Sequence, residues 1–315
     1  MAASIDVIVP VHDHYELTDR CLAHLAAQTV GHEVIVVDDD SSDGTPERLR
    51  RHWPAVRVLE LGTNHGYTHA VNRGVGAGSG EYIVLLNNDV ELEPEALEWM
   101  VTPLLEDERV GSVASVMLAP GGDAIDSVGV SADVTLAGFA RLQGSRREAA
   151  GSPAPVLAGP EGTAGAYRRS AWERVGGLDE RIRAYMEILD LALRLRSAGW
   201  GSVVAREAVG VHLGSRSYGR RSAAQRRLAG FSRGYLLRRY GVLRRRSGPR
   251  AALTEAIIVL GDAVLCRDVQ ALAGRLEGWR AAAGLPRHPW PPGEALDSSI
   301  TLRGSLALRS GAIAN

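Results

Sequence analysis

The chain has 315 residues, of which 45% are hydrophobic and 23% are charged, and its formal net charge at pH 7 is −1. These values exclude disordered, collagen-like and disulfide-stapled proteins, and the length predicts two structural units or one α/β unit with an appendage. Because the charges are balanced, no overall field selects nucleic acid, and we expect no nucleic-acid partner.

Lysine is absent, and all 36 basic residues are arginine. Phosphate-binding loops of NTPases, protein kinases and pyridoxal enzymes each need a lysine at a defined position, so these three classes are excluded. Cys21 and Cys266 are the two cysteines, and their wide separation argues against a disulfide framework or a zinc cluster. This cysteine usage predicts a reducing cytoplasm as the compartment.

We expect neither a signal peptide nor a membrane-spanning segment. The first four residues lack a basic region, and Asp6 interrupts the first apolar run. The late apolar run 256–260 ends at Gly261 and Asp262, far short of the roughly 20 residues that cross a bilayer. The predicted location is therefore cytoplasmic, with peripheral contact at the inner face of the membrane as an option.

The N-terminal third alternates short apolar runs with amphipathic stretches of helical length. This pattern is typical of parallel strands joined by crossover helices. Pro94 and Glu95 open one more helix, because proline suits the first helical turn and an acid suits its positive end. The predicted strands cover 5–11, 33–37, 56–61 and 82–86, and the predicted helices cover 15–28, 45–52 and 67–77.

From about residue 110 the pattern changes to shorter strands separated by glycine and proline. A helix is predicted over 186–198, two short strands over 202–205 and 209–212, and one or two helices over 251–283. Between Ala208 and Thr254 there are 12 arginines and no acid, which predicts either a solvated helix face or an anion-binding surface. The tail from residue 286 is too rich in Pro, Gly and Ser to assign.

Polar residues directly follow two of the predicted strands. Asp38 and Asp40 come after the strand 33–37, and Asn88 comes after the strand 82–86. In open parallel sheets ligands bind beyond the carboxyl ends of the strands, so these side chains are candidate ligand contacts. Asp38 is suited to accept a hydrogen bond from a base N–H or a ribose hydroxyl. A solvated turn rich in helix-capping acids is the alternative.

The second polar run also contains a candidate cation site. Asp89 stands beside the amides of Asn87 and Asn88, and hard cations such as Mg²⁺ or Mn²⁺ prefer oxygen ligands that they share with a diphosphate. His212, at the end of a later strand, is a candidate second ligand. Taken alone, His212 is more readily interpreted as a structural histidine.

Together these motifs resemble glycosyltransferase family 2, and most of all its rhamnosyltransferase-like branch. The resemblance runs from residue 4 to residue 216 in family order and at family-like spacing. The segments that carry it are Val9-Pro10-Val11-His12-Asp13, the run from Val36 to Thr45, Asn64-His65-Gly66, Asn72-Arg73-Gly74, Leu86-Asn87-Asn88-Asp89-Val90, the run from Gly176 to Arg181, Tyr185-Met186-Glu187, Ala198-Gly199-Trp200 and His212-Leu213-Gly214-Ser215.

The resemblance implies an α/β protein of the GT-A fold, whose mostly parallel nucleotide-binding sheet is flanked by helices, with a C-terminal α-helical extension. It implies inverting transfer of a sugar from a dTDP- or UDP-linked donor to a hydroxyl group. Rhamnose is one candidate for the sugar, and the acceptor is a glycan, a lipid-linked intermediate or a small molecule. The implied nucleotide contacts are Pro10, His12, Asp38, Asn64, Gly66 and Asn72, and the implied Mg²⁺ or Mn²⁺ ligands are Asp89 and His212. Asn87 replaces the first acid of the family's Asp-x-Asp element.

This resemblance divides the chain into segments with different expected roles. Residues 1–215 form the GT-A domain, with 1–112 as the nucleotide-binding half and 113–215 as the acceptor-binding half. An arginine-rich helical extension follows over 216–285, and a tail over 286–315. The arginines from Arg216 to Arg250 are expected to contact the donor diphosphate, an anionic acceptor or an anionic membrane leaflet, with a solvated helix as the default. The apolar helices that follow offer a homodimer surface.

The chain departs from its relatives at the general base. Relatives read Glu-Asp-Val-Asp, with the second residue as base, whereas residues 187–190 read Glu-Ile-Leu-Asp. Glu187 and Asp190 are the candidate bases, and an i,i+4 ion pair between Asp190 and Arg194 is the alternative role for Asp190. Because Ile188 occupies the usual base position, the alternative function is a sugar-nucleotide-binding relative with weak or no catalysis.

A further pattern, Gly230-Phe231-Ser232-Arg233-Gly234, fits the Gly-x-Ser-x-Gly nucleophile elbow of hydrolases. That elbow lies between a strand and a helix. The preceding residues 222–229 are instead predicted to be helical, so we interpret the match as chance.

Overall fold

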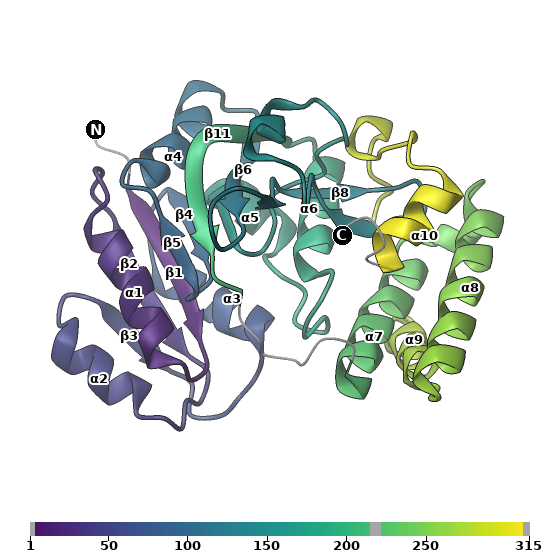
Figure 1. Ribbon diagram of the computed structural model, residues 1–315, viewed down its shortest axis with the longest axis horizontal. Helices are drawn as coiled ribbons and strands as arrows, with labels where there is room; N and C mark the ends of the chain where they lie inside the picture. The colour runs from purple at the N-terminus through teal and green to yellow at the C-terminus, as the bar shows by residue number, and fades with distance from the viewer. Residues whose placement is uncertain (1–3, 215–221, 311–315) are drawn as a thin grey trace.

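The computed structural model describes residues 4–214 and 222–310. Its centre is a mixed sheet in the order β3-β2-β1-β4-β10-β6-β11-β5, with β7 paired to β6 (Figure 1). The strands are β1 Ile5–Val11, β2 Glu33–Asp38, β3 Arg57–Glu60, β4 Tyr82–Leu86, β5 Val90–Leu92, β6 Val110–Leu118, β7 Ile125–Ser127, β10 Ala164–Arg168 and β11 Gly201–His212. Strands β1 to β4 are mutually parallel, and β10 and β5 are antiparallel to their neighbours. A small hairpin joins β8 Val130–Ala132 to β9 Gly138–Ala140.

Helices cover both faces of the sheet and form one end of the molecule. They are α1 Tyr15–Ala26, α2 Thr45–His52, α3 Tyr67–Ala77, α4 Ala96–Glu106, α5 Arg169–Val175, α6 Glu187–Ser197, α7 Ala223–Arg239, α8 Gly248–Cys266, α9 Gln270–Ala281 and α10 Leu302–Ser310. Across the described residues, no helix combines the length and apolarity that crossing a bilayer requires.

The predicted elements of the N-terminal third are present, several with the predicted bounds. Strands 5–11 and 82–86 and helices 45–52 and 67–77 match the structure. The two strands predicted at 202–205 and 209–212 are wrong, because they form the single strand β11. Its register against β6 shifts between Val204 and Val209, so the intervening residues interrupt the alternation of side chains without ending the strand.

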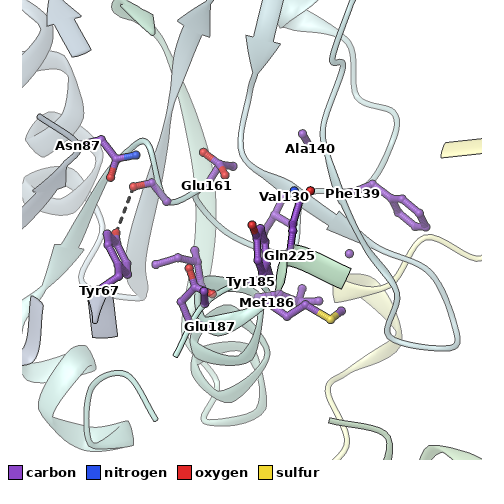
Figure 2. Close-up of a pocket in the computed structure, with 15 residues that line it drawn as sticks. Tyr67, Asn87, Val130, Phe139, Ala140, Glu161, Tyr185, Met186, Glu187 and Gln225 are labelled. Atoms are coloured by element: carbon purple, nitrogen blue, oxygen red, sulfur yellow. Dashed lines mark hydrogen bonds between the residues drawn. The ribbon is translucent and has the colours of Figure 1, made fainter. Parts of the chain in front are cut away.

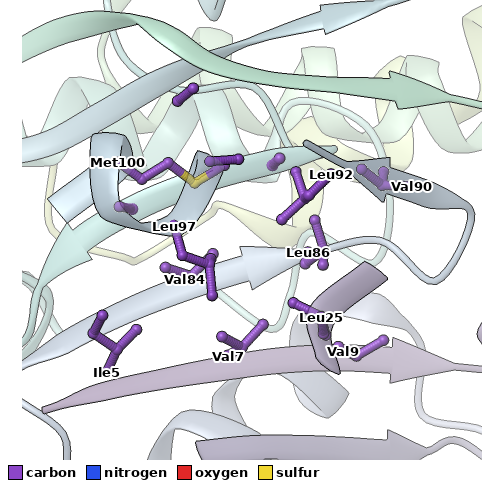
Figure 3. Packing of buried hydrophobic residues seen from close by; sticks show 14 of the residues in the cluster. Ile5, Val7, Val9, Leu25, Val84, Leu86, Val90, Leu92, Leu97 and Met100 are labelled. Carbon is purple, nitrogen blue, oxygen red and sulfur yellow. The ribbon is translucent and has the colours of Figure 1, made fainter. Parts of the chain in front are cut away.

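Alternate residues of the central strands feed two separate cores. Val7 and Val9 of β1 pack with α1 and α4, whereas Ile8 packs on the other face with α3 and α6. Figure 3 shows the first of these clusters, with Leu97 and Met100 of α4 lying over β1 and β4. Burial on both faces explains why these strands are continuously apolar in the sequence.

The C-terminal helices pack directly on the segment that leads into α6. Leu189 and Leu193 of α6 share a core with Tyr235 and Leu236 of α7. The Ser232 hydroxyl also donates a hydrogen bond of 2.7 Å to the Ala184 carbonyl. The helical extension therefore supports residues 184–193 rather than standing apart from them.

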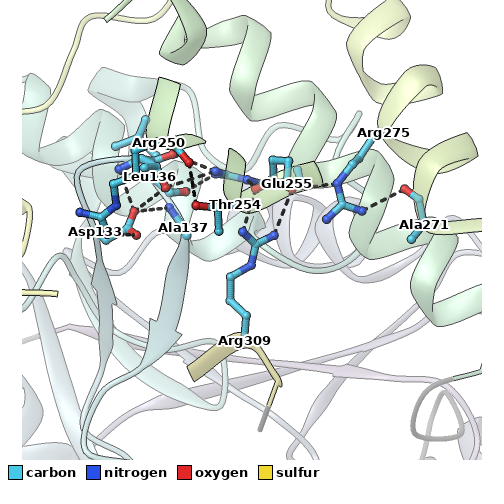
Figure 4. Close-up of polar contacts among 11 residues, drawn as sticks. Asp133, Leu136, Ala137, Arg250, Thr254, Glu255, Ala271, Arg275 and Arg309 are labelled. Carbon is cyan, nitrogen blue, oxygen red and sulfur yellow. Dashed lines mark hydrogen bonds and ion pairs between the residues drawn. The ribbon is translucent and has the colours of Figure 1, made fainter. Parts of the chain in front are cut away.

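The arginine-rich stretch is largely used inside the protein, so the predicted solvated helix face is wrong for much of it. Arg233 is buried and donates to Glu255 and to the carbonyls of Thr135 and Leu136. Glu255 also pairs with Arg275 and Arg309 (Figure 4). Internal partners are likewise described for Arg226, Arg227, Arg239 and Arg250, while Arg216, Arg220 and Arg221 lie outside the described residues.

The tail, which the sequence left unassigned, packs back against the chain over its described part. The Asp297 N–H donates 2.7 Å to the Ala132 carbonyl, and the Val156 N–H donates 2.8 Å to the Asp297 carboxylate. These contacts join residues near 297 to the β8 region.

The Gly230–Gly234 pattern lies within α7 rather than after a strand, which confirms that the elbow match is chance. Gly230 and Gly234 of α7 instead face the backbone of α9, and Gly274 and Gly278 of α9 face the backbone of α7. A Cβ atom at Gly234 would overlap the backbone at Arg275. These glycines allow α7 and α9 to pack with their backbones in contact.

We expect Gly234→Ala to destabilise the fold by about 3 kcal/mol or more, because the added methyl meets backbone that has no room to shift. Gly261→Ala on α8 is the matched control, since nothing lies within 4 Å of a Cβ atom there. This control should stabilise the protein by about 0.5–1 kcal/mol through helix propensity. Urea denaturation measures both, and equal stabilities for the two variants would refute the backbone contact.

Candidate active site

A cavity of about 680 Å³, here called the sheet-edge cavity, lies at the carboxyl ends of the parallel strands. It collects residues from the segments after β1, β2 and β4 and from the loop before α3, as the rule for open parallel sheets predicts. The sequence-predicted residues that line it are Pro10, His12, Asn64, Gly66, Asn88 and Asp89.

Asp39, which the sequence prediction did not select, organises this edge. Its two carboxylate oxygens accept hydrogen bonds of 2.8 and 2.7 Å from the backbone N–H groups of His65 and Gly66. Its carbonyl accepts a bond of 2.8 Å from the His12 ring. Asp39 thereby joins the segments after β1 and β2 to the loop before α3.

The other two acids of this run have different surroundings. Asp38 is buried at the end of β2, where its Oδ1 accepts from the Ser41 N–H at 3.0 Å. Its Oδ2 is buried and has no hydrogen-bond donor among the described residues, but Asp38 itself does not line the sheet-edge cavity. Asp40 is exposed, and it does not line the sheet-edge cavity.

Asn72 does not line the sheet-edge cavity either. Its amide donates to the Leu178 carbonyl at 2.9 Å and to Glu180 at 3.0 Å, and it accepts from the Leu178 N–H at 3.0 Å. These three bonds use the side chain to hold segment 178–180 on α3. The expected nucleotide contact at Asn72 is therefore replaced by a positioning role.

Asp89 and His212 lie together at the end of β4 and β11. Both Asp89 carboxylate oxygens are buried, and Oδ1 has no hydrogen-bond donor among the described residues. The His212 Nε2 atom is 3.3 Å from Asp89 Oδ2, and its Nδ1–H donates 2.8 Å to Asp126. Burial opposes the charged form of His212, but Asp126 and Asp89 outweigh it and raise the pKa of His212 to about 10.

These residues fit a divalent cation that shares its ligands with a substrate. Among the described residues no group of three or more His, Cys, Asp and Glu is arranged to hold a metal by itself. The buried carboxylate of Asp89 and a histidine whose other nitrogen is held by a carboxylate are a suitable partial ligand set. A diphosphate and water would have to complete the shell.

A second cavity of about 640 Å³, here called the Glu187 cavity, adjoins the first, because Tyr67, Asn87 and Ala184 line both. Figure 2 shows Glu161 and Glu187 projecting into it, with Tyr67 and Asn87 on one side and Tyr185 and Met186 on the other. The Tyr67 hydroxyl donates 3.2 Å to the Gly162 carbonyl.

Glu187 is the first residue of α6, and its backbone setting is unusual. Tyr185 and Met186 precede it with φ of 62° and 66°, the left-handed region that non-glycine residues rarely adopt. Glu187 Oε2 is buried without a donor among the described residues. Burial, reinforced by the nearby Glu161, raises the pKa of Glu187 to about 7. A carboxylate that titrates near neutral pH is suited to accept a proton during a reaction.

Ile188 and Asp190, which also belong to the segment that replaces the family's base motif, are packed inside the protein. Ile188 is buried, lines the Glu187 cavity and packs near Gly162. Asp190 is fully buried, accepts from Arg194 Nε at 2.7 Å and from the Tyr240 hydroxyl at 3.0 Å, and does not line the cavity. The i,i+4 ion pair is therefore present, and its geometry removes Asp190 as a candidate base.

Several residues of the site were missed because they come from distant or inconspicuous segments. Glu161 lies in a Gly-Pro-Glu-Gly turn, and Asp126 lies 86 residues from His212. Arg183 is the single arginine that lines the sheet-edge cavity, and no carboxylate among the described residues pairs with it. Tyr67 directly follows the Asn64-His65-Gly66 motif, and this adjacency was a usable clue.

Comparisons with known proteins agree on one group. The family model described as glycosyl transferase family 2 matches residues 6–176. An N-acetylglucosaminyl-diphospho-decaprenol L-rhamnosyltransferase from Mycobacterium tuberculosis is 30% identical over 232 residues, which cover 65% of this chain and 75% of the relative.

Two solved structures share the fold. The mannosyltransferase PcManGT from Pyrobaculum calidifontis, in complex with GDP-Man and Mn²⁺, superposes with a TM-score of 0.53 at 20% identity, covering 90% of this chain and 86% of that one. GalNAc-T7 with UDP, GalNAc and Mn²⁺ superposes with a TM-score of 0.61 at 14% identity, covering 80% of this chain and 51% of that one.

Proposed function

Because this chain belongs to glycosyl transferase family 2 and has the GT-A fold of a sugar-nucleotide-dependent glycosyltransferase, we propose that it is an inverting enzyme acting on a lipid-linked acceptor. The observation that carries the proposal is the junction of the two cavities at Tyr67, Asn87 and Ala184. One cavity has the features of a donor site, and the other presents a carboxylate with a raised pKa.

The donor is a dTDP- or UDP-linked sugar, with rhamnose as the first candidate. The relative named as a rhamnosyltransferase supports this choice of sugar, and its diphospho-decaprenol substrate supports the lipid-linked acceptor. Asp38 lies beside Asp39, which lines the sheet-edge cavity, and its buried Oδ2 would have to become exposed to accept from the base or the ribose. Arg183, which lines the sheet-edge cavity, supplies positive charge for the diphosphate.

A Mg²⁺ or Mn²⁺ ion would be held by Asp89 and His212, with Asp126 fixing the orientation of the histidine ring. When bound, such an ion neutralises charge on a departing diphosphate. The guanidinium group of Arg183 would neutralise part of the same negative charge on the diphosphate.

Glu187 is proposed as the general base. As the acceptor oxygen bonds to the anomeric carbon, the bond from that carbon to the diphosphate breaks on the opposite face, and the hydroxyl proton passes to the Glu187 carboxylate. The nucleoside diphosphate leaves with the bonding electrons, so charge and atoms balance. The adjoining cavities suit this geometry, because the proposed donor cavity and the Glu187 cavity meet at Tyr67, Asn87 and Ala184.

Nucleoside diphosphate release tests the function directly. We expect release from one member of a panel of UDP-, dTDP- and GDP-sugars, dependent on an acceptor such as a polyprenyl-diphosphate N-acetylglucosamine. The presence of Ile188 at the family's base position favours a second candidate, a donor-binding relative without catalysis. Donor binding by calorimetry with no release across the panel would select that second candidate.

A further inference from the structure

The C-terminal helices expose an unusually apolar surface. On α8, Leu253, Ile257, Leu260 and Val264 recur at i, i+4, i+7 and i+11, so they lie on one side of the helix. The surface continues through the turn between α8 and α9 into α9. We call this set the α8–α9 face, and its exposed members are Leu253, Ile257, Leu260, Val264, Leu265, Val269, Leu272 and Leu276.

Exposure is greatest at the turn between the two helices. Leu265 is 82% exposed and Val264 is 75% exposed, although both are apolar. Soluble proteins rarely leave contiguous apolar patches uncovered, and larger ones mark sites of protein or membrane interaction. The α8–α9 face therefore has the character of an interaction surface.

The charges around this face are positive. Arg244, Arg245 and Arg246 are exposed just before α8, and Arg267 is exposed just after it. None of these four has a carboxylate partner among the described residues. Of the acids nearby, Glu255 is buried among three arginines, and Asp262 lies about 200° around α8 from Leu260, although only about 60° from Leu265.

This arrangement of charges favours an anionic membrane over a second copy of the chain as the binding partner of the α8–α9 face. A two-fold symmetric pairing through α8 would bring the arginines before the helix against Arg267 or against their own counterparts, because an isologous interface repeats the same patch. Both pairings set like charges together. An anionic lipid surface meets apolar and cationic groups at once, as interfacial helices do.

The face also lies beside the proposed site. Asp268, in the turn between α8 and α9, pairs with Arg226 in the first turn of α7. The same turn of α7 supplies Gln225 to the Glu187 cavity, and Leu228 one turn later lines the sheet-edge cavity. Figure 1 shows the lower ends of α7, α8 and α9 at the same side of the molecule.

We propose that the α8–α9 face docks the protein on an anionic bilayer, with the mouth of the Glu187 cavity turned toward the membrane surface. A lipid-anchored acceptor would then present its head group to Glu187 without leaving the bilayer. Only this choice of acceptor rests on the proposed function; the docking itself does not. The docking site is thus the apolar face of α8 and α9, whereas the arginine-rich stretch before it contributes chiefly its last exposed residues, Arg244 to Arg246.

Flotation of the full chain with vesicles tests the docking. We expect binding to vesicles of equal phosphatidylglycerol and phosphatidylcholine at low salt, and at least tenfold weaker binding to phosphatidylcholine alone. The double variant Val264→Ser, Leu265→Ser should bind the anionic vesicles at least tenfold more weakly. Leu105→Ser is the matched control, because Leu105 is 56% exposed on α4, away from the face, and its replacement should leave binding unchanged.

Three results would overturn the docking: no binding at low salt, binding that the double variant retains, or a concentration-dependent dimer that the double variant dissociates without any vesicle binding. Thermal melts that match the parent protein exclude misfolding of the variant.

Turnover separates this proposal from the proposed function. With a short-chain, water-soluble acceptor the double variant should match the parent protein, and with acceptor embedded in vesicles it should be at least tenfold slower. Vesicle binding without turnover on either acceptor would reject the enzyme function and leave the docking intact. Normal turnover on embedded acceptor by the double variant would reject the role of the docking in presenting the acceptor.

Discussion

Replacing Glu187 by glutamine is expected to lower turnover at least tenfold, and by as much as the 10²–10⁴-fold that a positioned general base contributes. Glutamine keeps the size of the side chain and its place at the start of α6, but it cannot accept the acceptor's proton. Because Asp190 is buried in an ion pair with Arg194, it is not available to substitute. Initial rates at saturating donor measure the loss.

The pH dependence of the turnover rate distinguishes a general base at Glu187 from a purely structural residue. Glu187 accepts a proton only as the carboxylate, and its pKa is raised to about 7 by burial and by Glu161. The rate of the parent enzyme should therefore rise as the pH increases through about 7 and level off above it. Glu187→Gln should lose this limb, and Glu161→Gln should move its midpoint to lower pH.

An unchanged rate in Glu187→Gln would remove Glu187 as the base. If Glu187→Gln instead loses activity, adding Ile188→Asp is informative, because Ile188 occupies the family's base position and lines the same cavity. Recovery of activity in that double variant would mean that a carboxylate at either position reaches the same proton.

Replacing Asp89 by asparagine should lower donor-dependent turnover by about 100-fold or more. The change replaces one of the two buried carboxylate oxygens, which lie beside the ring of His212, with an NH₂ group. Loss of a direct cation ligand should lower activity at least as much as loss of a residue that only orients such a ligand, which typically lowers it 10–100-fold. Chelation of the parent enzyme should produce a similar loss, reversed by Mn²⁺ or Mg²⁺.

Two variants calibrate the Asp89 result. Asp126→Asn should weaken the metal response by about 10–100-fold, because Asp126 holds the other nitrogen of His212. Asp40→Asn should be close to the parent, because Asp40 is exposed and outside the sheet-edge cavity. A metal titration of Asp89→Asn that overlays the parent curve would exclude Asp89 as a ligand.

Local sequence alone determined the order of the elements and the edge of the sheet where ligands bind. Apolar runs such as 5–11 and 82–86 predict strands because a strand buried on both faces has no polar alternation. Polar residues that directly follow such strands must lie at the carboxyl edge, so Asp89 and Asn88 were predictable there. His212 was a candidate from its place at the end of a later strand, and the family resemblance added Glu187.

Tertiary structure alone decided which groups meet and how each is charged. Sequence periodicity reveals which face of a helix is apolar, but it does not reveal the partner across the chain. Asp126 beside His212, Tyr240 on Asp190, and the glycines of α7 against those of α9 are all such long-range pairings. The raised pKa of Glu187 likewise depends on burial among segments more than 20 residues away, since desolvation is a property of the packed fold and not of the local sequence.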